Sequence, residues 1–80
     1  MKKIDMKLTG ENIKSHCEKA NLSPKELSRL FNIDISTIYY WFNGKTLPRF
    51  DIAYNIADLC NCTLDNLIVL QQEEEEDARD

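Results

Sequence analysis

Apolar residues recur along the chain with the spacing of one face of a short helix. The spacing i, i+3, i+4 and i+7 marks the buried side of an amphipathic α-helix. It predicts helices over about residues 10–20, 24–31, 34–43 and 50–60, and a short fifth helix that begins after Thr63. The expected inward residues are, in chain order, Ile13, His16, Cys17, Ala20, Leu27, Leu30, Phe31, Ile38, Trp41, Phe42, Ile52, Ala53, Ile56, Ala57, Cys60, Leu64, Leu67 and Ile68. We therefore expect an all-α fold of five short helices, without strands or internal repeats.

Residues at the expected helix ends support these boundaries. Thr9 is a suitable cap for the first helix, and Asn21 suits the left-handed conformation in which many helices end. Asn32 tolerates a positive φ angle in the same way, and Asp34 is a good N-cap for the third helix, which stops at Gly44. These signals place a turn at each junction of the helical pattern.

The strongest start signal is the segment Ser23-Pro24-Lys25-Glu26. A serine cap, a proline at the first helical position and a glutamate three residues after the cap form a capping box. The helix over 24–31 is followed, after a short turn, by the helix over 34–43. Two short helices joined in this way make a helix-turn-helix, in which the first helix crosses the DNA backbone and the second reads base edges in the major groove.

The net charge of -4 does not suit a nucleic-acid binder until its distribution is considered. Six of the fourteen acidic residues lie in the last eight positions, and without residues 71–80 nine Lys and Arg face eight Asp and Glu, a charge of +1. We therefore expect a flexible basic arm over residues 1–8, a DNA-binding domain over 9–70, and an acidic tail over 71–80 that is disordered or a frayed helical extension.

Several other classes of protein are disfavoured by the sequence. No run of about eighteen apolar residues is present to span a membrane, and the charged N-terminus lacks the apolar stretch of a secretory signal, so we expect a cytoplasmic protein that does not bind membranes. An odd count of three cysteines favours free thiols. A metal site at Cys60-Asn61-Cys62 would have only the distant His16 as a further ligand, so we expect no metal and no cofactor.

An enzymatic function is also disfavoured. Gly10 and Gly44 are the only glycines, so the chain has no glycine-rich phosphate loop. His16, the sole histidine, falls on the expected buried face of its helix. Its neighbour Cys17 points about 100° away around the helix, which does not suit a catalytic pair.

The order and spacing of several motifs resemble the Cro/CI-type (XRE) helix-turn-helix family of transcriptional regulators. The matching motifs are Ser23-x-x-Glu26-Leu27-Ser28, Phe31-Asn32-Ile33-Asp34-x-Ser36-Thr37-Ile38, Trp41-x-Asn43-Gly44-Lys45-x-x-Pro48, Ile56-Ala57 and Thr63-Leu64-Asp65-x-Leu67. The resemblance covers roughly residues 9–70. It implies a lambda-repressor-like bundle in which the second and third helices form the helix-turn-helix.

The resemblance also implies a role for each residue of the third helix and its surroundings. The residues expected to face bases are Ile35, Ser36, Tyr39 and Tyr40. Those expected at phosphates are Lys25, Thr37, Asn43, Lys45 and Arg49. The core of this helix is expected to be Ile38, Trp41 and Phe42. A serine hydroxyl can bond a base edge, and an isoleucine can contact a thymine methyl group.

The sequence departs from the family pattern at four places. Pro24 replaces the glutamine that contacts phosphate in many members. Ser28 occupies a small position that is usually alanine, and it is still small enough for the close helix crossing. The recognition face lacks Arg, Gln and Asn, the side chains that make bidentate contacts with purines. Cys17 and Phe42 stand where many relatives carry a buried arginine–glutamate pair. Replacing only one partner would leave a buried charge unpaired, at a cost of about 3–5 kcal/mol in stability, whereas replacing both partners with apolar groups is tolerated. We therefore expect Cys17 and Phe42 to touch in the core.

The leading functional hypothesis is a regulator, specifically a repressor, that binds double-stranded DNA as a homodimer. Four consecutive apolar residues, Leu67–Leu70, cannot all face one core, so Val69 or Leu70 is a candidate for the dimer contact. The alternative is an interaction module, similar to an antitoxin, whose helix-turn-helix surface binds protein. The acidic tail is expected to be a solvated extension, or else a segment that covers the surface of Lys25, Lys45 and Arg49 and competes with phosphate.

Overall fold

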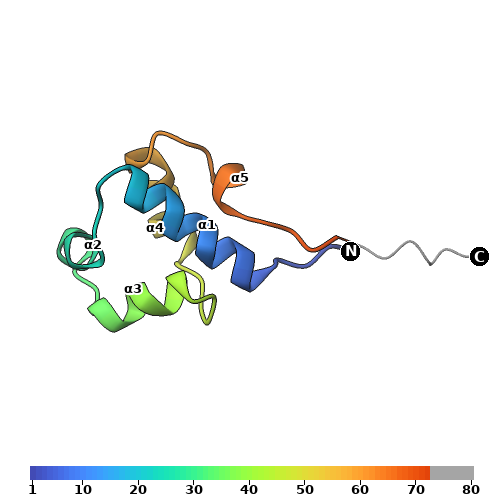
Figure 1. Cartoon of the computed structure of the whole chain (residues 1–80), viewed down its shortest axis with the longest axis horizontal. Coiled ribbons are helices and arrows are strands. Elements are labelled where there is room, and N and C mark those ends of the chain that lie inside the picture. Colours follow the sequence, from blue (N-terminus) through green and yellow to red (C-terminus); the bar gives the residue numbers. More distant parts are fainter. Residues whose placement is uncertain (73–80) are drawn as a thin grey trace, which may run out of the picture.

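The computed structural model describes residues 1–72, and this part of the chain is helical, as predicted. The helices are, in chain order, α1 (Met6–Lys19), α2 (Pro24–Phe31), α3 (Ile35–Phe42), α4 (Phe50–Leu59) and α5 (Leu64–Leu67). In Figure 1, α1 runs through the middle of the bundle with α3 below it and α5 above it. Among these residues, no helix is long and apolar enough to cross a bilayer.

Every helix contributes to one apolar core. Its fully buried side chains are Ile13, Cys17, Leu27, Ile38, Ile56 and Leu67, all 0% exposed. Cys17 and Phe42 lie in the same cluster, at 0% and 6% exposure, so neither side chain is in solvent. His16 and Ala20, both expected inward, are only half-buried. The expected free thiols are present, because no disulfide joins the three cysteines.

Leu30 was expected in the core and is instead 58% exposed. Its helix, α2, buries Leu27 fully and packs Phe31 partly against the core. At about 100° per residue these two side chains lie close together on the helix surface, whereas Leu30 lies beyond the edge of the face that they define. The i, i+3 spacing therefore overestimated the width of the buried face in this short helix.

The N-terminal boundary of the first helix differs from the prediction. Asp5, not Thr9, is the cap, and its carboxylate accepts a hydrogen bond from the Leu8 N–H at 2.9 Å. Thr9 is buried inside the helix, where its hydroxyl accepts from the Val69 N–H at 2.9 Å. Burial of a polar side chain is tolerated there because the hydroxyl is bonded to a segment far away in the sequence.

Part of the segment expected to be a flexible arm is paired with the end of the domain. Ile4 forms an isolated antiparallel bridge with Leu70. The Asp5 N–H donates to the Val69 carbonyl and the Gln71 N–H donates to the Lys3 carbonyl, each at 2.7 Å. Residues 6–8 belong to α1. Most of the acidic tail, residues 73–80, lies outside the described residues.

The other end signals are found where they were predicted. The capping box forms, with the Ser23 hydroxyl accepting from the Glu26 N–H at 3.1 Å and the Glu26 carboxylate accepting from the Ser23 N–H at 3.0 Å. Asn21 and Asn32 have positive φ angles of 61° and 54°. Thr63 caps α5. Asp34 occupies the N-cap position of α3, but its side chain makes no capping hydrogen bond.

Candidate nucleic-acid interface

The turn between α2 and α3 is held by the side chain of Ser28. The Ser28 hydroxyl donates to the Ile33 carbonyl at 2.5 Å, and the Ile33 N–H donates back to the Ser28 carbonyl at 3.0 Å. Beneath the turn, Leu27 of α2 and Ile38 of α3 are both fully buried. These contacts fix the angle between the two helices. Sequence reasoning treated Ser28 only as a small residue at a helix crossing and missed this bond.

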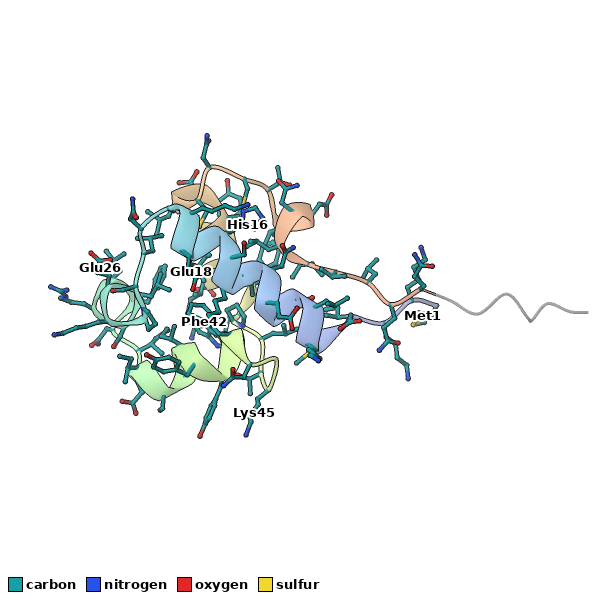
Figure 2. The ribbon with its side chains drawn as sticks, viewed as in Figure 1. Met1, His16, Glu18, Glu26, Phe42 and Lys45 are labelled. Carbon is teal, nitrogen blue, oxygen red and sulfur yellow. The ribbon has the colours of Figure 1, made fainter. Side chains whose placement is uncertain are left out.

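The inner face of α3 belongs to the core. Ile38, Trp41 and Phe42 are 0%, 3% and 6% exposed, and Figure 2 shows Phe42 between α1 and α3. The Tyr39 ring meets the Phe42 ring edge to face, with centroids 6.5 Å apart and an interplanar angle of 81°. This is a favourable geometry for two aromatic rings. The buried Phe42 ring thereby restrains the exposed Tyr39 ring.

The outer face of α3 is open to solvent and carries mixed chemistry. Ile35, Tyr39 and Tyr40 are 41%, 49% and 46% exposed, and Ser36 is also exposed. Three hydroxyl groups on this face can donate or accept hydrogen bonds, while Ile35 offers methyl groups of the kind that contact thymine. The face thus combines hydrogen-bonding and apolar groups without a charged side chain of its own.

Lys45 supplies a positive charge next to this face. Its ammonium nitrogen lies 5.8 Å from the centre of the Tyr40 ring, within the range of a cation–π interaction. The Lys45 N–H also donates to the Tyr40 carbonyl at 2.9 Å, so the loop after α3 is tied to the helix. In Figure 2 the Lys45 side chain points away from the body of the molecule. The sequence predicted a cation near the backbone of DNA but not its pairing with Tyr40.

A cleft of about 540 Å³ flanks one side of the exposed face of α3. Tyr39 of α3 and Asn43, the residue after α3, line it on one side, and Ser23 and Pro24 line it at the start of α2. Lys14 of α1 lines it too, a residue that sequence reasoning did not single out. Lys14 and Asn43 are a cation and an amide of the kind that bind phosphate. Glu18 also lines the cleft, and its negative charge disfavours the binding of an anion there.

A second cleft, of about 490 Å³, lies beside the turn on the other flank of α3. Thr37, which is half-buried, lines it together with Arg49 and the turn residue Asn32. The Arg49 guanidinium forms an ion pair with Asp51 at 3.2 Å, and both side chains are well exposed. The hydrogen bond from Arg49 holds the pKa of the Asp51 carboxyl below its ordinary value. Part of the Arg49 charge is therefore already engaged by Asp51.

The predicted phosphate-binding residues thus fall into separate groups around α3. Asn43 lies in the first cleft, and Thr37 and Arg49 lie in the second. Lys45 lies against the outer face, and Lys25 is exposed at the start of α2, directly after Pro24 of the first cleft. Groups of the kind that can bind phosphate therefore flank the outer face of α3 on both sides. The two strands of a duplex flank a helix in its major groove in the same manner.

These features define a helix-turn-helix protein of the class that regulates transcription through DNA. The helix-turn-helix family model matches residues 13–67, and the chain belongs to this family, in agreement with the Cro/CI-type (XRE) resemblance. An uncharacterized HTH-type transcriptional regulator of Archaeoglobus fulgidus is 29% identical over 62 residues, which cover 78% of this chain and 87% of that protein. A comparison with solved structures gave no match. The matched range includes α2, the turn, α3, α4 and α5 in full.

Proposed function

We propose that this regulator binds operator DNA by inserting α3 into the major groove, and that it acts as a repressor by occupying its site. The observation that carries the proposal is the exposed outer face of α3, with polar and basic side chains on both of its flanks. Backbone contacts set the position of a protein on DNA, and side chains at base edges provide discrimination. Occupation of an operator excludes other proteins from the same DNA.

Base reading on this proposal depends on hydroxyl and methyl groups. Ser36 and Tyr40 bond base edges or adjacent phosphates, and Ile35 packs on thymine methyl groups. Asn43, Lys45 and Lys14 hold the phosphates. Because the outer face has no arginine, we expect single base changes in the site to cost toward the lower end of about 1–3 kcal/mol each.

We further propose that the chain binds as a dimer through the segment around Leu70. Of the four apolar residues Leu67–Leu70, Leu67 is fully buried, Ile68 and Val69 are half-buried, and Leu70 is 49% exposed. Leu70 also lies on the short bridge with Ile4, where an open backbone edge is available to a second copy. A dimer would recognise two half-sites about one helical turn, or 34–36 Å, apart.

The test is selection of an operator from a randomised duplex library, followed by binding measurements at two salt concentrations. We expect affinity for the selected site to fall steeply as salt rises, because phosphate contacts release counterions. Replacing Tyr40→Phe removes one hydroxyl and should weaken binding about three- to tenfold. Tyr54→Phe is the matched control, since Tyr54 is also an exposed tyrosine but lies on α4.

Two results would count against the proposal. One is a library selection that enriches no sequence and no salt-dependent binding to any duplex. The other is an equal loss of affinity in the two tyrosine variants. The interaction-module alternative would be supported if the chain did not bind DNA but bound a protein partner, and if Tyr40→Phe abolished that binding.

A further inference from the structure

The two parts of the chain carry opposite charge. Residues 1–49, which include α1, α2 and α3, hold nine Lys and Arg against five Asp and Glu, a net charge of +4. Residues 50–80 hold one basic residue against nine acidic ones, a net charge of -8, and the two values give the overall -4. The segment that forms α4 and α5 contains no Lys or Arg. Phosphate is therefore repelled from α4 and α5 while it is attracted elsewhere.

The first of these helices, α4, exposes two large aromatic side chains to solvent. Phe50 and Tyr54 are 75% and 58% exposed and lie four residues apart, on one side of α4. Tyr54 borders a groove of about 390 Å³ between α4 and α5, which Asp58 and Asp65 also line. We call the surface formed by Phe50, Tyr54, Asp58 and Asp65 the α4–α5 face. Exposed aromatic residues beside a groove are typical of protein-binding surfaces.

Asp58 and Asp65 leave this face with a net negative charge. Neither carboxylate forms an ion pair with any residue in the described part of the chain. Asp51, at the Phe50 end of α4, is neutralised by Arg49 at 3.2 Å. The unbalanced charge is thus concentrated at the groove end of the face, next to Tyr54.

We propose that the α4–α5 face binds a basic segment of a partner protein, with apolar side chains against Phe50 and Tyr54 and Lys or Arg side chains at Asp58 and Asp65. Charge complementarity decides between the possible occupants. A second copy related by a two-fold axis would present the same aspartates to each other, and like charges disfavour that contact. The acidic residues 73–77 of the same chain are repelled for the same reason.

The position of this face leaves the recognition helix accessible. Figure 1 shows α3 and α5 on opposite sides of α1. A partner bound in the groove between α4 and α5 therefore does not cover α3, and the inference does not depend on DNA binding by α3. Together with the proposed function, it describes an adaptor that joins DNA on one side to a basic protein on the other.

The test begins with a displayed library of random twelve-residue peptides, selected on the full chain and counter-selected on a Phe50→Ser, Tyr54→Ser variant. The recovered peptides should combine Lys or Arg with large apolar residues. Titration of the isotopically labelled chain with a recovered peptide should shift amide resonances of α4 and α5. Replacing Asp58→Asn and Asp65→Asn together should weaken peptide binding about tenfold.

The matched control is Glu11→Gln with Glu18→Gln, which changes the net charge equally but leaves the α4–α5 face intact. These exposed acids lie on α1. Equal weakening in the two double variants would overturn the proposal, because it would indicate general attraction to an acidic chain. Recovery of no discriminating peptide, or of peptides without basic residues, would overturn it as well. Self-association of the chain that Tyr54→Ser abolishes would also overturn the proposal, because the face would then bind a second copy of the chain.

Discussion

Gly10 of α1 lies against the carbonyl oxygen of Trp41 at the end of α3. A Cβ atom at Gly10 would sit 2.5 Å from that oxygen and 2.7 Å from the Phe42 carbonyl oxygen. Gly44, which follows α3 with a φ angle of 76°, makes the reciprocal approach, since its Cβ would sit 2.7 Å from the Met6 carbonyl oxygen. Two glycines thus allow α1 and the end of α3 to touch through their backbones, which holds the end of α3 close against α1.

Replacing Gly10→Ala should therefore destabilise the domain. The clash involves backbone atoms, which cannot move as a flexible side chain does, and overpacking of this kind costs about 1–3 kcal/mol. Better helix propensity offsets up to about 1 kcal/mol of that cost. Urea unfolding should show a net loss of about 1–2 kcal/mol in the free energy of unfolding. Ser15→Ala on the same helix is the control and should change little; an unchanged or more stable Gly10→Ala protein would refute the close packing.

Replacing Lys45→Gln should weaken DNA binding and reduce its dependence on salt. Lys45 is exposed beside Tyr40, where its charge faces the side on which DNA is proposed to bind. Loss of one phosphate contact should lower affinity about three- to tenfold and reduce the slope of log affinity against log salt by about 1. Lys19→Gln, at the end of α1, removes an equal charge from a residue that lines neither cleft beside α3, and serves as control. Equal slopes in the two variants would mean that Lys45 makes no phosphate contact.

Deleting residues 73–80 should tighten DNA binding at low salt. The deletion removes six acidic residues and one arginine, which changes the net charge from -4 to +1. Repulsion of the duplex then decreases, and added salt should remove most of the difference between the two chains because it screens exposed charges. Fluorescence anisotropy at two salt concentrations measures both effects. Unchanged affinity at low salt would show that the tail does not act on the DNA-binding surface.

The stability of the domain should fall at alkaline pH because of Cys17. Burial, and next the nearby Cys60, raise the pKa of the Cys17 thiol from 9.0 to about 12. Below 9.0 both the folded and unfolded states keep the proton, whereas between 9.0 and about 12 only the folded state keeps it. The free energy of unfolding therefore decreases as the pH rises through this range.

A Cys17→Ala variant isolates the contribution of this thiol. The variant loses packing at neutral pH and should be the less stable protein there. The difference in free energy of unfolding between the two proteins should narrow from about pH 7 to about pH 10.5, because the variant lacks the titrating thiol. Urea unfolding at the two pH values provides the comparison. A constant difference would contradict the raised pKa.

Local patterns were sufficient to predict most of the helical architecture. The capping box at Ser23 and the positive φ angle of Asn32 depend on neighbouring residues alone, and α2 was predicted with its observed ends. The inner face of α3 follows from the spacing of Ile38, Trp41 and Phe42. Helix ends and faces of this kind can be read because each signal lies within a few residues of the structure that it specifies.

The features that sequence reasoning missed depend on contacts between distant segments. Thr9 is a good cap by type, but Val69 supplies a partner that allows it to be buried within α1. Lys14 belongs to the first cleft only because α1 crosses the end of α3. Motif spacing around α3 contains no information on α1. Arg49 was expected at phosphate, and its pairing with Asp51 depends on side-chain rotamers that spacing does not specify.

The bridge between Ile4 and Leu70 brings the two ends of the domain together. The helices could therefore follow one another in a different order along the chain without a change of fold. Met1 and the end of the described chain leave the bundle side by side (Figure 1). A short linker could join these ends. The chain could then be opened at an exposed position such as Asn61, between α4 and α5, and every helix would keep its packing partners in the bundle. In such a circular permutant, α5 would precede α1 directly, and the helix-turn-helix would lie in the middle of a continuous sequence.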